Sequence, residues 1–228
     1  MSDSVFTPLT QAKLDWQDGV PASTTFDDSY FSRDDGLAES DYVFLQGNRL
    51  TERFQSLPED GQFVVGETGF GTGLNFLLAA RLFVANAPAS SRLHFFSVEG
   101  FPLTPQDLQR AHQSWPELAS ECAELQANYP PSTPGFHRRW LFNGRVSLTL
   151  AQGQACAMLE HAGLQADAWF LDGFAPSRNS DMWQPRLYQA LASCSRAGAT
   201  LATFTAAGQV RRDLAEAGFQ VTRIPGHG

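Results

Sequence analysis

The feature that most constrains this chain is an apolar strand that runs directly into a glycine-rich loop and then into an apolar helix. Phe63-Val64-Val65 is typical of the strand, the loop spans 66–73, and the helix is predicted from Leu74 to Val84. Glycines at positions 69, 71 and 73 let the backbone turn tightly and approach a ligand without Cβ clashes. Such a unit indicates a parallel α/β sheet, in which ligands bind beyond the carboxyl ends of the strands.

Strands and helices continue to alternate along the rest of the chain. Asn143-Gly144, between apolar segments at 140–142 and 146–150, is a strong signal for a hairpin turn. Thr104-Pro105 is typical of a helix start, with a threonine cap and proline in the first turn. Further strands are predicted at 93–98, 168–171, 200–204 and 219–224, and a further helix at 209–217. We therefore expect an α/β fold with a mostly parallel sheet and helices on both faces.

Residues 1–60 differ in character from the rest of the chain. They are rich in Asp, Ser and aromatic residues, with a short strand predicted at 42–45 and a helix at 50–57. We interpret 1–60 as an N-terminal extension that packs on the substrate side of a core formed by 61–228.

The composition excludes several classes of protein. Hydrophobic residues make up 43% and charged residues 18%, so a sizeable buried core is expected. No apolar run approaches the roughly 18 residues of a membrane span. The three cysteines are widely spaced, as expected of core thiols in a reducing cytoplasm. The five histidines show no ligand spacing, so no metal is expected.

The charge balance bears on nucleic-acid binding. A net charge of −8 argues against a sequence-independent grip on nucleic acid. Lys13 is nevertheless the one lysine among the basic residues, and arginine suits bidentate contacts to phosphate. Local pairs occur at Arg138-Arg139 and Arg211-Arg212. We interpret most of the arginines as ordinary surface salt-bridge residues.

The glycine loop narrows the class of ligand. Gly69 and Gly71 fit the start of the dinucleotide fingerprint, but Leu74 stands where its third glycine belongs, and no Lys-Ser/Thr pair of a phosphate loop follows. An acidic residue that ends a strand and precedes G-x-G-x-G is typical of S-adenosylmethionine enzymes. The alternative is a glycine turn that only packs helix on strand. The candidate cofactor-binding residues here are Glu67, Gly69, Phe70, Gly71, Gly73 and Asn75.

Two further strands each end in a carboxylate. Glu99, followed by Gly100, ends the second strand, where a carboxylate can accept both hydroxyls of a ribose; the alternative is an exposed loop glutamate. Asp172 follows the 168–171 strand and begins an Asp-Gly-Phe-Ala-Pro turn. Amino-methylating enzymes place an Asp or Asn and an aromatic residue near this point, whereas a purely structural Asp172 would only cap the turn. Phe174 suits either stacking on a base or core packing.

Four segments together resemble the methyltransferase part of the bifunctional tRNA 5-methylaminomethyl-2-thiouridine biosynthesis proteins. The resemblance covers nearly the whole chain and is most specific at 170–183; the segments are 26–31, 42–48, 67–76 and 170–183. It implies a Rossmann-like sheet that transfers a methyl group from S-adenosylmethionine to the aminomethyl nitrogen of a modified wobble uridine in tRNA. Asp172 is then the candidate catalytic residue. The candidate substrate-binding residues are Tyr30, Phe31, Phe174, Pro176 and Arg178, of which Tyr30 and Phe31 equally suit packing of the extension.

The chain departs from the family pattern in two places. The family's hairpin strand leads into Gly-Asp near the adenine, but here it leads into Gly153-Gln154, so the amide of Gln154 is the candidate substitute. Fused members continue into a flavin-dependent oxidase domain, which is absent here. We also expect the sheet to lack its inserted last strand, with the 200–204 edge left unpaired or covered by 219–224.

Two other functions compete with tRNA methylation. One is a small-molecule or protein N-methyltransferase, which the acidic charge suits; the other is a non-catalytic module that binds an adenosine-containing ligand. The presence of both Glu99 and Asp172 beside the glycine loop argues against the non-catalytic module. The 170–183 segment favours the tRNA enzyme.

Overall fold

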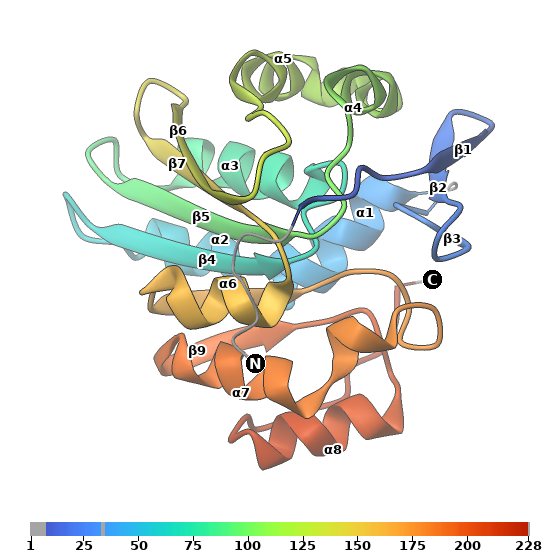
Figure 1. The fold of residues 1–228 in the computed structure, drawn as a ribbon. Helices are drawn as coiled ribbons and strands as arrows, with labels where there is room; N and C mark the ends of the chain where they lie inside the picture. Colours follow the sequence, from blue (N-terminus) through green and yellow to red (C-terminus); the bar gives the residue numbers. More distant parts are fainter. Residues whose placement is uncertain (1–7, 33–34, 228) are drawn as a thin grey trace.

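A central six-stranded sheet organises the computed structural model, which describes residues 8–32 and 35–227. Its strands run in the order β6-β7-β5-β4-β8-β9, and only β6 is antiparallel to its neighbour (Figure 1). The strands are β4 (Gln62–Thr68), β5 (Arg92–Glu99), β6 (Gly135–Leu141), β7 (Val146–Gln152), β8 (Ala166–Leu171) and β9 (Ser195–Ala202). The predicted mostly parallel α/β sheet is confirmed.

A small antiparallel sheet and a helical segment precede this core. The small sheet consists of β1 (Leu14–Gln17), β2 (Val20–Ser23) and β3 (Asp28–Ser29). The helical segment consists of α1 (Gly36–Ser40), a π-helix (Asp41–Gln46) and α2 (Leu50–Gln55). Figure 1 shows this small sheet and α1 beyond the carboxyl ends of β4 and β5, so these elements lie at the end of the sheet where ligands bind.

Helices cover both faces of the large sheet, as expected. The core helices are α3 (Leu74–Asn86), α4 (Pro105–His112), α5 (Ala119–Asn128), α6 (Ala155–Ala162), α7 (Pro185–Ser193) and α8 (Gly208–Glu216), with 3-10 turns at Pro116–Leu118 and Ser180–Trp183. One buried cluster joins the sheet to α2, α3, α4 and α5, and a second joins it to α6, α7 and α8.

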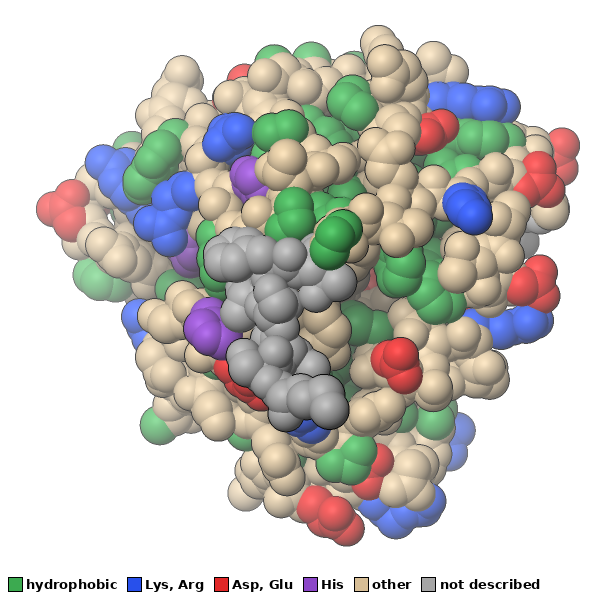
Figure 2. Space-filling view, viewed as in Figure 1, with side chains coloured by type: hydrophobic (Ala, Val, Ile, Leu, Met, Phe, Trp, Pro, Cys, Tyr) green, Lys and Arg blue, Asp and Glu red, His purple; other side chains and the backbone are tan. Residues whose placement is uncertain are grey.

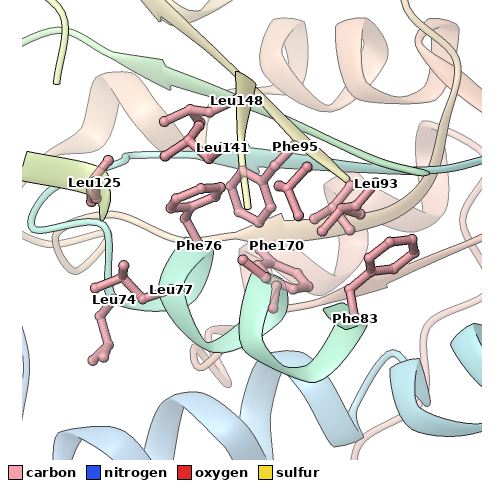
Figure 3. Close-up of a cluster of buried hydrophobic side chains, with 14 of the residues drawn as sticks. Leu74, Phe76, Leu77, Phe83, Leu93, Phe95, Leu125, Leu141, Leu148 and Phe170 are labelled. Carbon is pink, nitrogen blue, oxygen red and sulfur yellow. The ribbon is translucent and has the colours of Figure 1, made fainter. Parts of the chain in front are cut away.

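Alternation along the strands explains the two clusters. Phe95 faces α3, where its ring packs edge-on against Phe76 with centroids 5.3 Å apart, and Figure 3 shows this packing. Phe96 faces α6 instead. The Trp169 ring lies on the same side of the sheet as Phe96. It leaves no room for a side chain at position 66 of β4, because a Cβ on Gly66 would lie 2.2 Å from the ring. No helix in the described residues is long and apolar enough to cross a membrane.

Several local predictions are confirmed. The Thr104 side chain caps α4 by accepting from the Asp107 N–H at 3.0 Å, with Pro105 in the first turn. The hairpin turn lies at Asn143-Gly144, where both residues have positive φ. The strand predicted at 93–98 and the helix predicted at 209–217 match β5 and α8 to within two residues at each end.

Two predicted strands are wrong. Residues 42–45 lie in a π-helix, because Phe44 and Leu45 reach the cluster around α3 from a helical backbone. Residues 219–224 have no regular structure, and Val221 and Ile224 are exposed, so this segment does not cover the edge of β9. Within the described residues, β9 pairs only with β8, in agreement with the expected unpaired edge.

Candidate functional site

A cavity of about 750 Å³ lies at the carboxyl ends of β4, β5 and β8. The loops that follow these strands form one side, and residues of the N-terminal segment form the other. Most of the site residues predicted from the sequence line it: Tyr30, Gly69, Phe70, Gly71, Asn75, Glu99, Gly100, Gln154, Asp172 and Phe174. The volume is in the range of small-molecule and cofactor sites.

The three glycines of the loop serve different purposes. Gly69, Gly71 and Gly73 all have positive φ, a conformation that side chains disfavour. A Cβ on Gly71 would lie 3.1 Å from the Tyr30 ring at the cavity wall. A Cβ on Gly73 would instead lie 2.9 Å from both Leu125 of α5 and the Phe70 ring, and Gly73 itself does not line the cavity. Gly73 therefore packs α3 against α5, while Gly69 and Gly71 keep the cavity floor open.

Glu99 is held rigidly by the main chain. One carboxylate oxygen accepts from the Gly71 N–H at 2.8 Å and the other from the Phe101 N–H at 2.7 Å. The side chain is 8% exposed, and burial raises its pKa although these hydrogen bonds lower it. Each oxygen accepts one hydrogen bond and retains capacity for a second. The carboxylate can therefore receive two donors from a ligand in the cavity.

A side-chain amide links the carboxylates of β4 and β8. Asn75 Nδ2 donates to Asp172 Oδ2 at 2.7 Å and to Glu67 Oε1 at 3.0 Å. Asp172 Oδ1 accepts from the Gly173 N–H at 2.8 Å, and Glu67 Oε2 accepts from Ser97 Oγ at 2.6 Å. The Asp172 carboxylate thus caps its own turn and also lines the cavity, so the two roles considered for it coexist geometrically.

Burial governs the charge of these acids. It raises the pKa of Asp172 to about 6, against the lowering effect of the hydrogen bonds from Gly173 and Asn75. Burial also raises the pKa of Glu67, which lies behind the cavity wall. Asn75 Oδ1 is buried and has no hydrogen-bond partner within the described residues. Asp172 therefore titrates close to neutrality, where proton-transfer groups are most effective.

Aromatic rings form another part of the cavity wall. Phe26 stacks on Phe174 with centroids 4.8 Å apart, and Tyr30 meets Phe174 edge-on at 5.1 Å. Phe101 packs edge-on against Phe26 at 5.2 Å. Burial and the charge of Glu99 raise the pKa of Tyr30, which keeps its hydroxyl protonated. Phe26 and Phe101 were missed as site residues, although Phe26 begins the 26–31 segment and Phe101 lies two residues beyond Glu99.

The N-terminal segment is tied to the loop after β8. Asp28 accepts from the Ala175 N–H at 2.9 Å, and Asp27 pairs with Arg178 at 2.8 Å. Both members of the Asp27–Arg178 pair are exposed, and neither Arg178 nor Pro176 lines the cavity. The structure therefore brings Arg178 to the extension rather than to the cavity.

Phe31 and Gln154 occupy different settings. Phe31 packs on Trp115 with ring centroids 4.8 Å apart and lies outside the cavity lining, which matches the core-packing alternative. Gln154 lines the cavity and caps α6, its Oε1 accepting from the Ala157 N–H at 2.9 Å. Within the described residues, no group of three His, Cys, Asp or Glu side chains is arranged to hold a metal ion.

Comparison with known proteins identifies the class. The sequence profile of a family described as S-adenosyl-L-methionine-dependent methyltransferase matches residues 116–228, just under half of the chain. A crystal structure of MNMC2 from Aquifex aeolicus shares the fold, with a TM-score of 0.69 and 20% identity over 94% of this chain and 67% of that one.

Within the class, the chain matches one region of larger proteins. It is 55% identical over 219 residues to the tRNA 5-methylaminomethyl-2-thiouridine biosynthesis bifunctional protein MnmC of Chromobacterium violaceum, covering 96% of this chain and 33% of that protein. It is 53% identical over 218 residues to the protein of the same name from Pseudomonas aeruginosa, covering 95% of this chain and 33% of that protein. The chain thus corresponds to the methyltransferase part and spans about a third of these relatives' length.

Proposed function

We propose that this protein transfers a methyl group from S-adenosylmethionine to the aminomethyl nitrogen of a modified wobble uridine in tRNA, giving 5-methylaminomethyl-2-thiouridine. The observation that carries the proposal is the convergence of Glu99 and Asp172 on one cavity beside the open Gly69–Gly71 loop. The names of the relatives, which refer to biosynthesis of this nucleoside, support the choice of substrate. No oxidase activity is proposed for this chain.

The donor set of the cavity suits an adenosine-containing cofactor. The remaining acceptor positions of Glu99 suit the two hydroxyls of a ribose. Gly69 and Gly71 allow main-chain groups to approach closely, and Phe70, Gly100, Asn75 and Gln154 complete the candidate cofactor wall. When bound, the cofactor supplies an electrophilic methyl group on a sulfonium. Glu67 and Gly73 support this wall from behind rather than contacting the cofactor.

Asp172 prepares the substrate amine. An alkylamine resembling lysine has a pKa near 10.4, so its neutral form at pH 7 costs roughly 4–5 kcal/mol. Asp172, with a pKa of about 6, is mostly ionised at that pH and can accept one N–H, which directs the lone pair away from the carboxylate. The proton that leaves the nitrogen passes to Asp172 or to water. Asn75 positions the carboxylate by donating to it.

The aromatic wall holds the reacting groups close together and excludes water from them. Phe26, Tyr30 and Phe174 offer flat apolar faces on the substrate side of the cavity. Holding nitrogen and methyl in line can contribute roughly 7–11 kcal/mol through effective molarity. Because charge is redistributed rather than created in this reaction, no strongly charged group is needed to stabilise the transition state.

A methylation assay tests the substrate. The protein is incubated with labelled S-adenosylmethionine and with tRNA that either carries or lacks the 5-aminomethyl group. We expect label only in the first tRNA, at the wobble position. Labelling of free amines or proteins, with none of either tRNA, would favour the small-molecule or protein methyltransferase.

Calorimetry tests the cofactor separately. We expect S-adenosylhomocysteine to bind more tightly than NAD, because Leu74 breaks the dinucleotide pattern. Tighter binding of NAD would reverse the cofactor assignment. Binding of S-adenosylhomocysteine without turnover on any amine would indicate the non-catalytic module.

A further inference from the structure

The edge strand β6 presents an unusual outer face. Phe136, Arg138 and Trp140 alternate along the strand and point to one side of the sheet, since side chains two apart share a face. Phe136 is 42% exposed and Trp140 is 57% exposed, the most exposed large hydrophobic side chain among the described residues. We call these three residues the β6 face.

The helices on this side of the sheet leave the β6 face uncovered. The buried cluster beneath α6, α7 and α8 includes Phe96 of β5 and Ala151 of β7 but no residue of β6. The β6 face is nevertheless fixed in place from below. The Phe136 ring lies 6.4 Å from that of Phe96, and Arg138 Nε donates to Thr149 Oγ1 at 3.0 Å.

The stretch of sequence that carries the β6 face is free of acidic residues. The sequence from 125 to 159 contains no Asp or Glu, although the chain has 24 of them and a net charge of −8. Figure 2 shows basic and histidine side chains gathered on the side where Figure 1 places β6 and β7. Arg145 binds the carbonyls of Val84, Ala87 and Pro88, which leaves Arg138 as the basic group of the face itself.

The β6 face begins beside the candidate active site. Phe136 is paired with Ala151, and the chain continues from there into Gly153 and Gln154, which line the cavity. From Phe136 to Trp140 the strand extends for about 13 Å, at roughly 3.3 Å per residue. This is the length of a few nucleotides of an extended strand, leading away from the cavity.

We propose that the β6 face binds an unpaired segment of the tRNA next to the nucleotide that enters the cavity. This inference rests on the proposed function. Phe136 and Trp140 stack on bases, and Arg138 contacts the phosphate between them. Single-stranded RNA is the occupant that suits exposed aromatic rings separated by an arginine in a region without acids. An otherwise acidic protein would concentrate its RNA contacts on such a region.

The test is the affinity of tRNA for substituted proteins, measured by fluorescence anisotropy. We expect Trp140→Ala and Phe136→Ala each to weaken binding roughly 5- to 150-fold, the size of one lost stacking contact. We expect Arg138→Ala to lower the slope of log Kd against log salt by about 0.7–0.9. Ile224→Ala and Arg212→Ala remove an exposed apolar and a basic side chain elsewhere, and they should change neither quantity.

Two further measurements separate this inference from the proposed function. The affinity for S-adenosylhomocysteine and kcat at saturating tRNA should stay unchanged in Trp140→Ala, so that the loss lies in KM. If the wild type methylates tRNA but a variant that combines Phe136→Ala, Arg138→Ala and Trp140→Ala binds it with unchanged affinity and salt slope, the β6 face is not the docking face. A change from dimer to monomer with unchanged tRNA affinity would also overturn the inference. A wild type that neither binds nor methylates tRNA overturns both proposals.

Discussion

The ends of β5 and β8 each deliver one carboxylate to the cavity, but the two are held in different ways. Glu99 receives a main-chain N–H on each oxygen, from Gly71 and Phe101. Asp172 receives one main-chain N–H and one side-chain amide, from Gly173 and Asn75. Glu99 is buried and Asp172 is half-buried, and both have a raised pKa.

The difference fits the two proposed roles. Main-chain donors are fixed by the fold, so Glu99 is a rigid acceptor suited to a cofactor that binds in the same way in every cycle. Asp172 depends on Asn75, which also serves Glu67, so its position and pKa depend on one side chain. Such a group can be tuned to exchange hydrogen bonds with a reacting amine.

The largest effect is expected from Asp172→Ala. We expect kcat to fall by roughly 100- to 10,000-fold, the usual range for a residue that handles the transferred proton. Affinity for S-adenosylhomocysteine should stay within a few-fold, as Glu99 is untouched. Asp15→Ala, on the exposed side of β1, is the matched control. A variant that methylates tRNA at near wild-type rate would reduce Asp172 to a turn cap.

Glu99→Ala should show the opposite pattern. We expect the binding free energy of S-adenosylhomocysteine to weaken by roughly 1.5–3 kcal/mol, the contribution of a good hydrogen bond to a charged group. At saturating cofactor, kcat should change much less than in Asp172→Ala. Calorimetry measures the first quantity, and an unchanged Kd would remove Glu99 from the cofactor site.

The steepening of the acid limb of the pH profile should report Asp172. Protonation of the amine lowers log kcat/KM by one for each unit of falling pH, and protonation of Asp172 should double that slope below about pH 6. At pH 5 the additional loss is about tenfold. In Asp172→Asn the slope should remain single down to pH 5. A break that persists in this variant belongs to another group.

Asn75→Ala should move that break without abolishing turnover. Loss of the amide removes a hydrogen bond that lowers the pKa of Asp172, so the break should shift to higher pH. A purely structural role for Asn75 would lower stability and leave the break in place. Gln126→Ala is a control amide on α5, where it contacts His112 outside the cavity.

Most of the site residues at the carboxyl ends of the strands could be predicted from the sequence, but few of the residues that pack over those ends could. The loop from Gly69, Glu99 and Asp172 follow short apolar strands, so their meeting at one edge follows from parallel topology. The roles of Gly73 and Glu67 behind the wall depend on where α5 and Ser97 pack, and no local pattern encodes that.

The N-terminal segment shows why the remainder was not predicted. The segment 42–45 has the composition of a strand, with the sequence Tyr42-Val43-Phe44-Leu45. Packing against α3 nevertheless favours a helical backbone there. Phe26 reaches the site through stacking on Phe174, nearly 150 positions later in the chain. Contacts of this range are set by tertiary packing.

The bond between Asp28 and the Ala175 N–H joins residues that are 147 positions apart. During synthesis at about 5–20 residues per second, Ala175 is made roughly 7–30 s after Asp28. Phe26 and Tyr30 are therefore made before Phe174, the ring against which they pack, and remain without it while β4 to β7 are completed. The substrate side of the cavity closes only after β8 is in place.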